Sequence, residues 1–231
     1  MKHRFFACLT VLCLLFCAGC QPQKTAPSAA ALSVPARSLL VVPFDTAGAQ
    51  CFLVVRLSET GEVAITPFLR ETVFSQNTDS ATLYTLFADG GAVGFSRVTE
   101  AFCENGVPID RILSVRVDDA DSGLYPLLAA TGNNLFFADT KNGAALSSSA
   151  LRRRLSAPCR TGDETDYAAF RGTVAGAVIT GLAAAFGTDP SGLFSALLAA
   201  GHSSFVPADE AVLAALCSPA LRVRVCPVFY K

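Results

Sequence analysis

Residues 51–72 read CFLVVRLSETGEVAITPFLRET and decide the fold class. The runs Cys51–Leu57 and Val63–Pro67 are short, apolar and rich in β-branched side chains, which is typical of strands. The polar residues 58–62 between them include a glycine and predict a hairpin turn. A third run of the same kind, Ser38–Phe44, lies just upstream, so we expect two or three neighbouring strands in this region.

Helical patterns alternate with further strands downstream. Strands that alternate with helices over short connections favour an α/β fold, here a single three-layer αβα domain with a mixed central sheet. One of these helices, Gly172–Thr188, is uncharged throughout, but its glycines favour a buried core helix over a membrane span. The patterns predict helices at Ala81–Phe87, Val93–Phe102, Ser122–Ala130, Gly172–Thr188, Leu193–Ala200 and Ala208–Leu216, and strands at Ile109–Val117, Asn134–Ala138 and Leu221–Val225.

The composition excludes two broad classes of protein. The 231 residues are 52% hydrophobic and 16% charged, which is too apolar for a disordered chain. The formal net charge is −1, whereas a general nucleic-acid binder needs a basic surface to neutralise phosphates. We therefore expect a folded domain that does not bind nucleic acid.

The first twenty residues have the organisation of a secretory signal. Basic residues at 2–4 precede the apolar run Phe5–Phe16, and Cys-Ala-Gly-Cys follows at 17–20. The Ala-Gly-Cys ending resembles the bacterial lipobox, which implies lipid attachment to Cys20. An ordinary signal peptide and a short uncleaved anchor are the alternatives. The expected organisation is a lipoprotein signal peptide at 1–20, a flexible tether at 21–37 and the folded domain at 38–231.

The cysteines and histidines after the signal segment do not predict a metal site or a catalytic triad. The five cysteines are widely spread, with no Cys-x-x-Cys pair and no nearby histidine, and their pairing stays open. His202 is expected at a helix terminus and loop, and the common nucleotide-binding and hydrolase motifs are absent from the sequence. The cysteines are Cys51, Cys103, Cys159, Cys217 and Cys226.

Arginines near the predicted strands and helices are candidates for binding an anion. Arg70 follows the strand Val63–Pro67, Arg152 and Arg154 belong to a run of three arginines, and Arg171 leads into the long helix. A guanidinium offers a forked, permanently charged donor that fits phosphate oxygens. Without any resemblance, the run of three arginines favours a solvated face over a binding site.

The order of these segments resembles the LytR-CpsA-Psr family, over nearly the whole stretch from Ser38 to Lys231. Each segment alone is a weak signal, and their order and spacing carry the resemblance. Val63–Thr72 is similar to a strand and Ile-Pro-Arg-Asp-Thr segment, Leu83–Gly91 to a helix closing in Gly-Gly, Phe95–Asp110 to the next helix and the start of a strand, Ala150–Arg154 to Ala-Leu and Arg-x-Arg, and Gly162–Tyr167 to a Gly-Asp segment.

This resemblance implies an extracytoplasmic, membrane-attached protein that moves glycopolymers from a polyprenyl-diphosphate carrier to peptidoglycan. It implies a hydrophobic channel for the lipid tail inside an α/β core. The phosphate-binding residues would be Arg70, Arg152, Arg154 and Arg171. Arg70 and Asp45 would be catalytic, and Asp45 would hold Mg²⁺.

Departures from the family pattern bear on this activity. Ala49-Gln50 stands where a metal-binding aspartate is expected, and Glu71 stands where an aspartate follows the arginine. A magnesium site relies on one or two carboxylates besides substrate phosphates. We therefore favour a lipid-anchored protein on the outer face of the cytoplasmic membrane that binds a polyprenyl-phosphate-linked glycopolymer or another apolar ligand. An active magnesium-dependent glycopolymer–peptidoglycan phosphotransferase and a structural envelope lipoprotein are the alternatives.

Overall fold

The computed structural model describes residues 37–45, 48–76, 79–88, 91–117, 127–128, 131, 137–138, 145–146, 148–157, 159–187, 189–206, 209–218 and 220–229. The predicted signal peptide, the predicted lipid attachment at Cys20 and nearly all of the predicted tether lie outside these residues. The predicted boundaries of the three segments therefore stay predictions.

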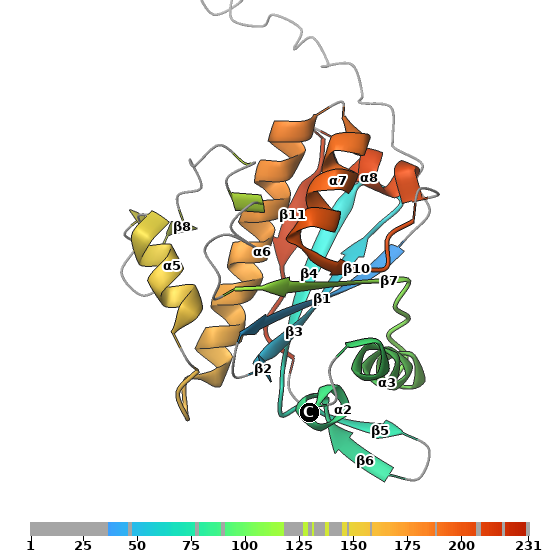
Figure 1. Ribbon diagram of the computed structural model, residues 1–231, viewed down its shortest axis with the longest axis vertical. Helices are drawn as coiled ribbons and strands as arrows, with labels where there is room; N and C mark the ends of the chain where they lie inside the picture. Colours follow the sequence, from blue (N-terminus) through green and yellow to red (C-terminus); the bar gives the residue numbers. More distant parts are fainter. Residues whose placement is uncertain are drawn as a thin grey trace, which may run out of the picture. The chain divides into compact units, whose positions relative to one another are not determined.

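The central sheet of the described chain has seven strands (Figure 1). Its middle is an antiparallel meander of β1 (Arg37–Asp45), β3 (Cys51–Leu57) and β4 (Glu62–Leu69), as residues 51–72 predict. β7 (Arg111–Arg116) is parallel to β1, and β10 (Gly201–Ser203) is antiparallel to β7. At the other edge β11 (Arg222–Val225) is parallel to β4, and β2 (Gly48–Ala49) pairs with the end of β1. The strand order is β10-β7-β1-β3-β4-β11, so the sheet is mixed.

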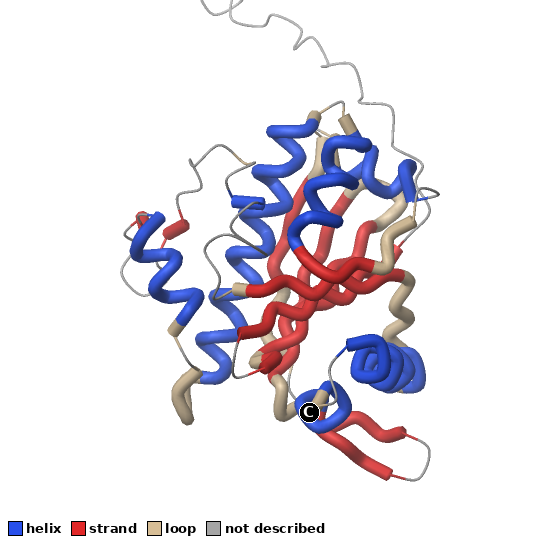
Figure 2. The backbone as a smooth tube through the Cα atoms, viewed as in Figure 1, coloured by secondary structure: helices blue, strands red, loops and turns tan. Residues whose placement is uncertain are grey.

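Helices cover both faces of this sheet and confirm the predicted α/β fold in three layers (Figure 2). One face packs against α5 (Ser148–Ser156), α6 (Glu164–Phe186), α7 (Pro190–Ala200) and α8 (Glu210–Leu216). The other face packs against α2 (Leu83–Phe87) and α3 (Gly91–Glu104). Two small antiparallel ribbons complete the described elements: β5 (Val73–Gln76) with β6 (Asp79–Thr82), and β8 (Phe137–Ala138) with β9 (Ala145–Leu146).

The strands β1 and β3 supply both cores, because successive side chains of a strand point to opposite faces of the sheet. Leu40 and Phe52 are fully buried on the α3 side, whereas Val41 and Leu53 face α6. The α3-side core is filled with aromatic rings that meet edge to face. The ring centroids of Phe102 and Phe68 are 5.0 Å apart, and those of Phe102 and Phe74 are 4.9 Å apart.

Glycines bring α6 close to the sheet. A Cβ at Gly172 would stand 2.7 Å from Cγ of Pro67, and one at Gly176 would stand 3.3 Å from Cγ2 of Val225. By length and composition alone, α6 is the one described helix that passes the test for a membrane span. In the fold it packs against β4 and β11, as the glycines in its sequence predict for a core helix.

The structure corrects some local predictions. Residues 79–82 form β6, so the helix predicted from Ala81 begins only at Leu83, where Thr82 Oγ1 accepts the Thr85 N–H at 3.1 Å. His202 lies in β10 rather than at a helix terminus and loop, because Gly201 lets this strand approach the Ser114 carbonyl more closely than a Cβ would allow. The helix expected at Gly172 begins at Glu164. The predicted helix Ser122–Ala130 lies largely outside the described residues.

A half-buried ion pair, in which the Arg111 side chain is 33% exposed and that of Asp209 is 5% exposed, connects the start of α8 to the start of β7. Arg111 donates from Nε to Asp209 Oδ2 at 2.7 Å and from Nη2 to Asp209 Oδ1 at 2.8 Å. Asp209 also accepts the Val206 N–H at 2.9 Å, and its side chain is only 5% exposed. The hydrogen bonds from Arg111 hold the pKa of this carboxyl below its ordinary value of 3.8.

We expect Asp209→Asn to lower the free energy of unfolding at pH 7 by about 2–4 kcal/mol, because the variant leaves Arg111 without its counter-charge. A carboxylate with a lowered folded-state pKa stabilises the fold above about pH 4, and this contribution is lost as the pH falls through the lowered value. The variant should therefore lose less stability than the wild type between pH 5 and pH 2, as measured by urea unfolding. Glu62→Gln, which breaks an exposed ion pair with Arg224, should follow the wild type. An equal acid response in Asp209→Asn would contradict the assignment.

Candidate functional site: an apolar cavity with a buried arginine at one end

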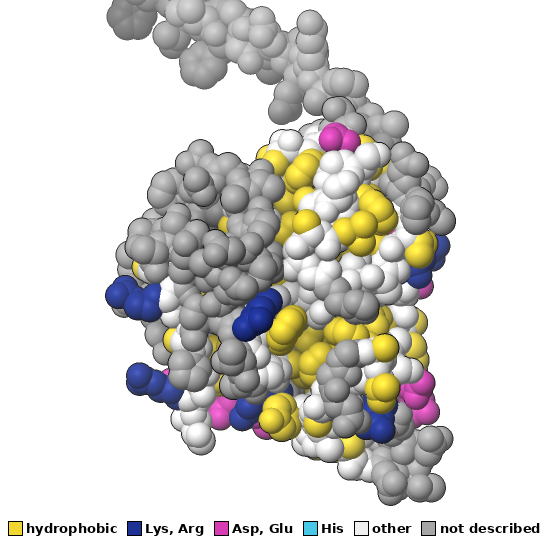
Figure 3. All heavy atoms as spheres, in the orientation of Figure 1, with side chains coloured by type: hydrophobic (Ala, Val, Ile, Leu, Met, Phe, Trp, Pro, Cys, Tyr) yellow, Lys and Arg dark blue, Asp and Glu magenta, His cyan; other side chains and the backbone are white. Residues whose placement is uncertain are grey.

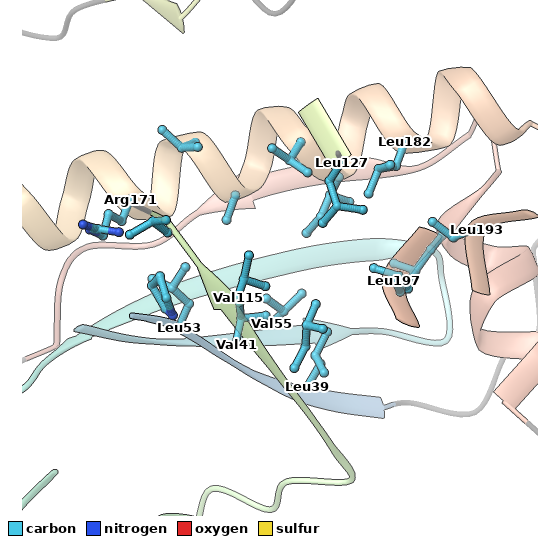
Figure 4. Close-up of a pocket in the computed structure, with 18 of the residues that line it drawn as sticks. Leu39, Val41, Leu53, Val55, Val115, Leu127, Arg171, Leu182, Leu193 and Leu197 are labelled. Carbon is cyan, nitrogen blue, oxygen red and sulfur yellow. The ribbon is translucent and has the colours of Figure 1, made fainter. Parts of the chain in front are cut away.

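An elongated apolar cavity lies between the sheet and the helices α6 and α7. Its volume is about 110 Å³, or about 910 Å³ when the open space at its mouth is counted. Figure 4 shows Arg171 at one end of the row of labelled side chains and Leu193 and Leu197 near the other. The walls come chiefly from β1, β3, β7, α5, α6, α7 and α8 and are almost wholly aliphatic. The labelled members are Leu39, Val41, Leu53, Val55, Val115, Leu127, Arg171, Leu182, Leu193 and Leu197.

Arg171 is the charged side chain among the described residues that line the cavity. It is 3% exposed, and its Nη2 donates to the Leu155 carbonyl oxygen at 2.8 Å and to the Tyr167 hydroxyl. Tyr167 lies one helical turn before Arg171, which places the two side chains on the same face of α6. The guanidinium carbon is 4.3 Å from the centroid of the Tyr167 ring. Nε and Nη1 are buried and have no hydrogen-bond partner among the described residues. Two donors are therefore left to meet a ligand.

Arg70 lies at the end of β4 and is held by two neighbours. Its Nε donates to Glu71 at 2.5 Å, and its Nη1 donates to Oε1 of Gln50 at 2.6 Å. Its guanidinium also lies 5.2 Å from the centroid of the Tyr84 ring. The hydrogen bond with Glu71 raises the pKa of Arg70, so the residue is a permanent cation. Its side chain is 36% exposed and can reach solvent, unlike that of Arg171.

Electrostatic effects show that Asp45, Arg70 and Arg171 belong to one neighbourhood. Burial raises the pKa of the Cys159 thiol, and Arg70 and Arg171 both act against this rise. Burial likewise raises the pKa of Tyr167 to about 12, with Arg171 opposing the rise and Asp45 adding to it. Three of the residues that the sequence nominated therefore gather near the Arg171 end of the cavity. Both nearby thiols are protonated at neutral pH, because burial also raises the pKa of Cys51 to about 12.

The other two nominated arginines lie on α5. The Arg154 guanidinium carbon is 3.9 Å from the centroid of the Phe170 ring, beside Arg171 on α6. Arg152 belongs to the same helix, but its side chain lies outside the described part of the structure, as does the predicted lipid-bearing Cys20. The sequence analysis missed Tyr167 as a partner of Arg171, although the spacing of four residues was a usable signal. It also missed the role of Gln50 as an acceptor for Arg70, a contact that no sequence spacing reveals.

Solved structures share this architecture. TagT bound to LI-WTA superposes with a TM-score of 0.58 at 10% identity, over 83% of this chain and 78% of TagT. TagV from B. subtilis gives 0.53 at 14% identity, over 82% and 84% of the two chains. The LytR-Csp2A-Psr enzyme from Actinomyces oris gives 0.50 at 19% identity, over 83% and 80%. The fold is that of a LytR-Csp2A-Psr enzyme. Neither a family model nor a curated protein matches the sequence, so the likeness is one of fold.

Magnesium held by Asp45 is what the family resemblance implies, but the neighbouring groups do not complete such a site. Magnesium prefers carboxylate and other oxygen ligands. Gln50 is a neutral amide whose Oε1 already accepts from Arg70, and the Glu71 carboxylate is paired with the same arginine. The described residues contain no group of three or more His, Cys, Asp or Glu that could hold a metal ion. The donor set at this end of the cavity is suited to an anion rather than to a cation.

We expect Arg171→Met to leave the free energy of unfolding unchanged or to raise it by about 1–2 kcal/mol. Methionine has a similar length, and the substitution removes the two buried nitrogens that lack a partner, each of which costs about 1–3 kcal/mol. This gain offsets the loss of the hydrogen bonds to the Leu155 carbonyl and the Tyr167 hydroxyl. The matched control is Arg153→Met, which removes the same charge from an exposed position on α5 and should change stability by less than about 0.5 kcal/mol. Urea unfolding of both variants measures this. A loss of more than about 2 kcal/mol in Arg171→Met would show that Arg171 serves stability and not a ligand.

Proposed function

We propose that this protein binds an amphiphile made of a polyprenyl tail and a phosphate or diphosphate head, of the kind that carries glycopolymers to the cell wall. The observation that carries the proposal is the Arg171 guanidinium, 3% exposed, with two unpartnered donors at the end of an apolar cavity. A hydrocarbon tail and an anionic head are the two parts of one molecule that together satisfy this site.

The two parts of the ligand make separate contributions to binding. The tail gains from leaving water for an aliphatic cavity, by about 0.8 kcal/mol for each buried CH₂ group. The head accepts charge-assisted hydrogen bonds from the free donors of Arg171, each worth about 1.5–3 kcal/mol. Arg70 lies in the same neighbourhood and is exposed enough to meet the outer part of a diphosphate. The head would therefore bind through guanidinium groups, with Arg154 and Arg152 close by on α5.

The place of action follows from the sequence and the shared fold. The predicted lipid on Cys20 would hold the domain at the outer face of the cytoplasmic membrane, where polyprenyl-linked polymers and peptidoglycan meet. TagT, which has the same fold, is solved with LI-WTA bound. The proposal is therefore a role in cell-envelope biogenesis. We propose binding rather than transfer, because Gln50 and Glu71, which stand where the family pattern has aspartates, are both engaged with Arg70, and a magnesium site relies on carboxylates besides substrate phosphates.

Binding of farnesyl phosphate and of farnesol to the purified full chain in detergent tests the proposal. The wild type should prefer the phosphate at least tenfold, because only the phosphate meets the donors of Arg171. Arg171→Met should abolish this preference and retain the affinity for farnesol, and Arg153→Met should behave as the wild type. Equal affinity of the wild type for the two compounds would overturn the proposal. Native mass spectrometry of the chain as isolated should also find an anionic prenyl lipid.

Release of polyprenyl phosphate from a polyprenyl-diphosphate-linked saccharide tests the alternative of an active transferase. We expect no release above background, with or without magnesium, from a chain that binds farnesyl phosphate. Magnesium-dependent release that Arg70→Ala abolishes would instead establish the enzyme. The assay separates the two functions, since both require binding and only one requires turnover.

A further inference from the structure

A second, smaller hollow adjoins the apolar cavity, and its lining does not include Arg171. Four side chains line both spaces, so the two hollows share a wall: Leu39, Val55, Phe205 and Leu216. The second hollow is lined further by Leu57 and Val212, which are apolar, and by polar residues at its outer edge. A hydrocarbon chain that filled the first hollow would therefore reach the second one next.

Strand β1 runs from one end of this combined space to the other. Its last residue, Asp45, acts electrostatically on Tyr167 at the Arg171 end, and its first residue, Arg37, lines the second hollow. The nine residues of β1 span about 26 Å at 3.3 Å per residue. The second hollow consequently lies at the Arg37 end of β1.

The Arg111–Asp209 ion pair closes this end. Both residues line the second hollow, and their two hydrogen bonds of 2.7 and 2.8 Å engage both oxygens of the carboxylate. The Val206 N–H holds the same carboxylate from the α8 side. A hydrocarbon cannot replace these contacts, because separating the pair leaves an uncompensated charge in a largely buried place. The two arginines thus differ: two nitrogens of Arg171 have no hydrogen-bond partner among the described residues, whereas each nitrogen of Arg111 donates a hydrogen bond.

We propose that the Arg111–Asp209 pair is the stop that limits the length of the hydrocarbon tail the cavity encloses. The inference rests on the proposed function, since it concerns the tail of the same amphiphile. A prenyl chain that fits between Arg171 and the pair is enclosed completely. The excess of a longer chain stays outside the cavity and adds nothing to affinity. Tail length is therefore selected by an ion pair that has no contact with the head.

The ratio of the affinities for undecaprenyl phosphate and farnesyl phosphate tests this role. The full chain in detergent is compared with the double variant Arg111→Met/Asp209→Asn, in which the asparagine oxygen can still accept the Val206 N–H. We expect the double variant to bind undecaprenyl phosphate at least tenfold more tightly, because burying about two further CH₂ groups is worth that factor. Its affinity for farnesyl phosphate should stay within twofold of the wild type. An unchanged ratio would overturn the proposal.

Two further variants keep the result interpretable. Arg224→Met/Glu62→Gln removes a second arginine–carboxylate pair, whose Nε–Oε1 distance is 3.0 Å. These two residues line neither the apolar cavity nor the second hollow, so the variant should leave both affinities unchanged. Arg111→Lys keeps the charge but loses the fork, so it should fold even if the double variant does not and should raise the ratio about threefold. No rise in this variant would count against the stop. Failure of the wild type to bind farnesyl phosphate would instead refute the proposed function, which distinguishes the two claims.

Discussion

Alternation of side chains along β1 and β3 is the constraint on which the rest of this structure depends. Both strands are covered on both faces, so each must supply two cores at once. On the α3 side, Phe52, Phe68 and Phe102 fill the space with rings in edge-to-face contact. On the α6 side, the facing residues are branched aliphatic chains under a helix that carries glycines against β4 and β11. The α3 side of the sheet therefore packs with aromatic rings, and the α6 side contains the apolar cavity.

Arg171 is a buried charged side chain whose hydrogen bonds are incomplete, which lowers the stability of the fold. A guanidinium in an aliphatic wall loses its hydration, and Leu155 and Tyr167 return hydrogen bonds to only one of its three nitrogens. Native proteins satisfy nearly all buried polar groups, and they violate that rule mainly at functional sites. The same side chain also ties α5 to α6 through the Leu155 carbonyl, so that the wall of the cavity and the group that faces it are positioned together.

Charged side chains are arranged differently near Arg171 and in the second hollow. Near Arg171, the thiols of Cys51 and Cys159 are protonated and Gln50 is neutral, so the groups that can meet an anion are guanidinium groups. In the second hollow, the charges of Arg111 and Asp209 satisfy each other. Among the coloured residues on the face drawn in Figure 3, basic side chains stand apart from one another and hydrophobic ones gather over α7 and below it.

Local pattern alone determined the strands at β1, β3 and β4, the core helix α6 and the α/β class, because burial and turn chemistry over a few residues specify these elements. The sequence also nominated Asp45, Arg70 and Arg171, which lie near one end of the cavity. It could not determine that Arg171 is buried beside Tyr167 while its Nε and Nη1 lack hydrogen-bond partners among the described residues, or that Gln50 accepts a hydrogen bond from Arg70. Those contacts join residues that 16 or 20 positions of chain separate, as Arg171–Leu155 and Arg70–Gln50 show. Residues so far apart in the chain come into contact only when the tertiary structure forms. The hollow is likewise a tertiary result, since it is the volume that side chains from seven helices and strands leave unfilled.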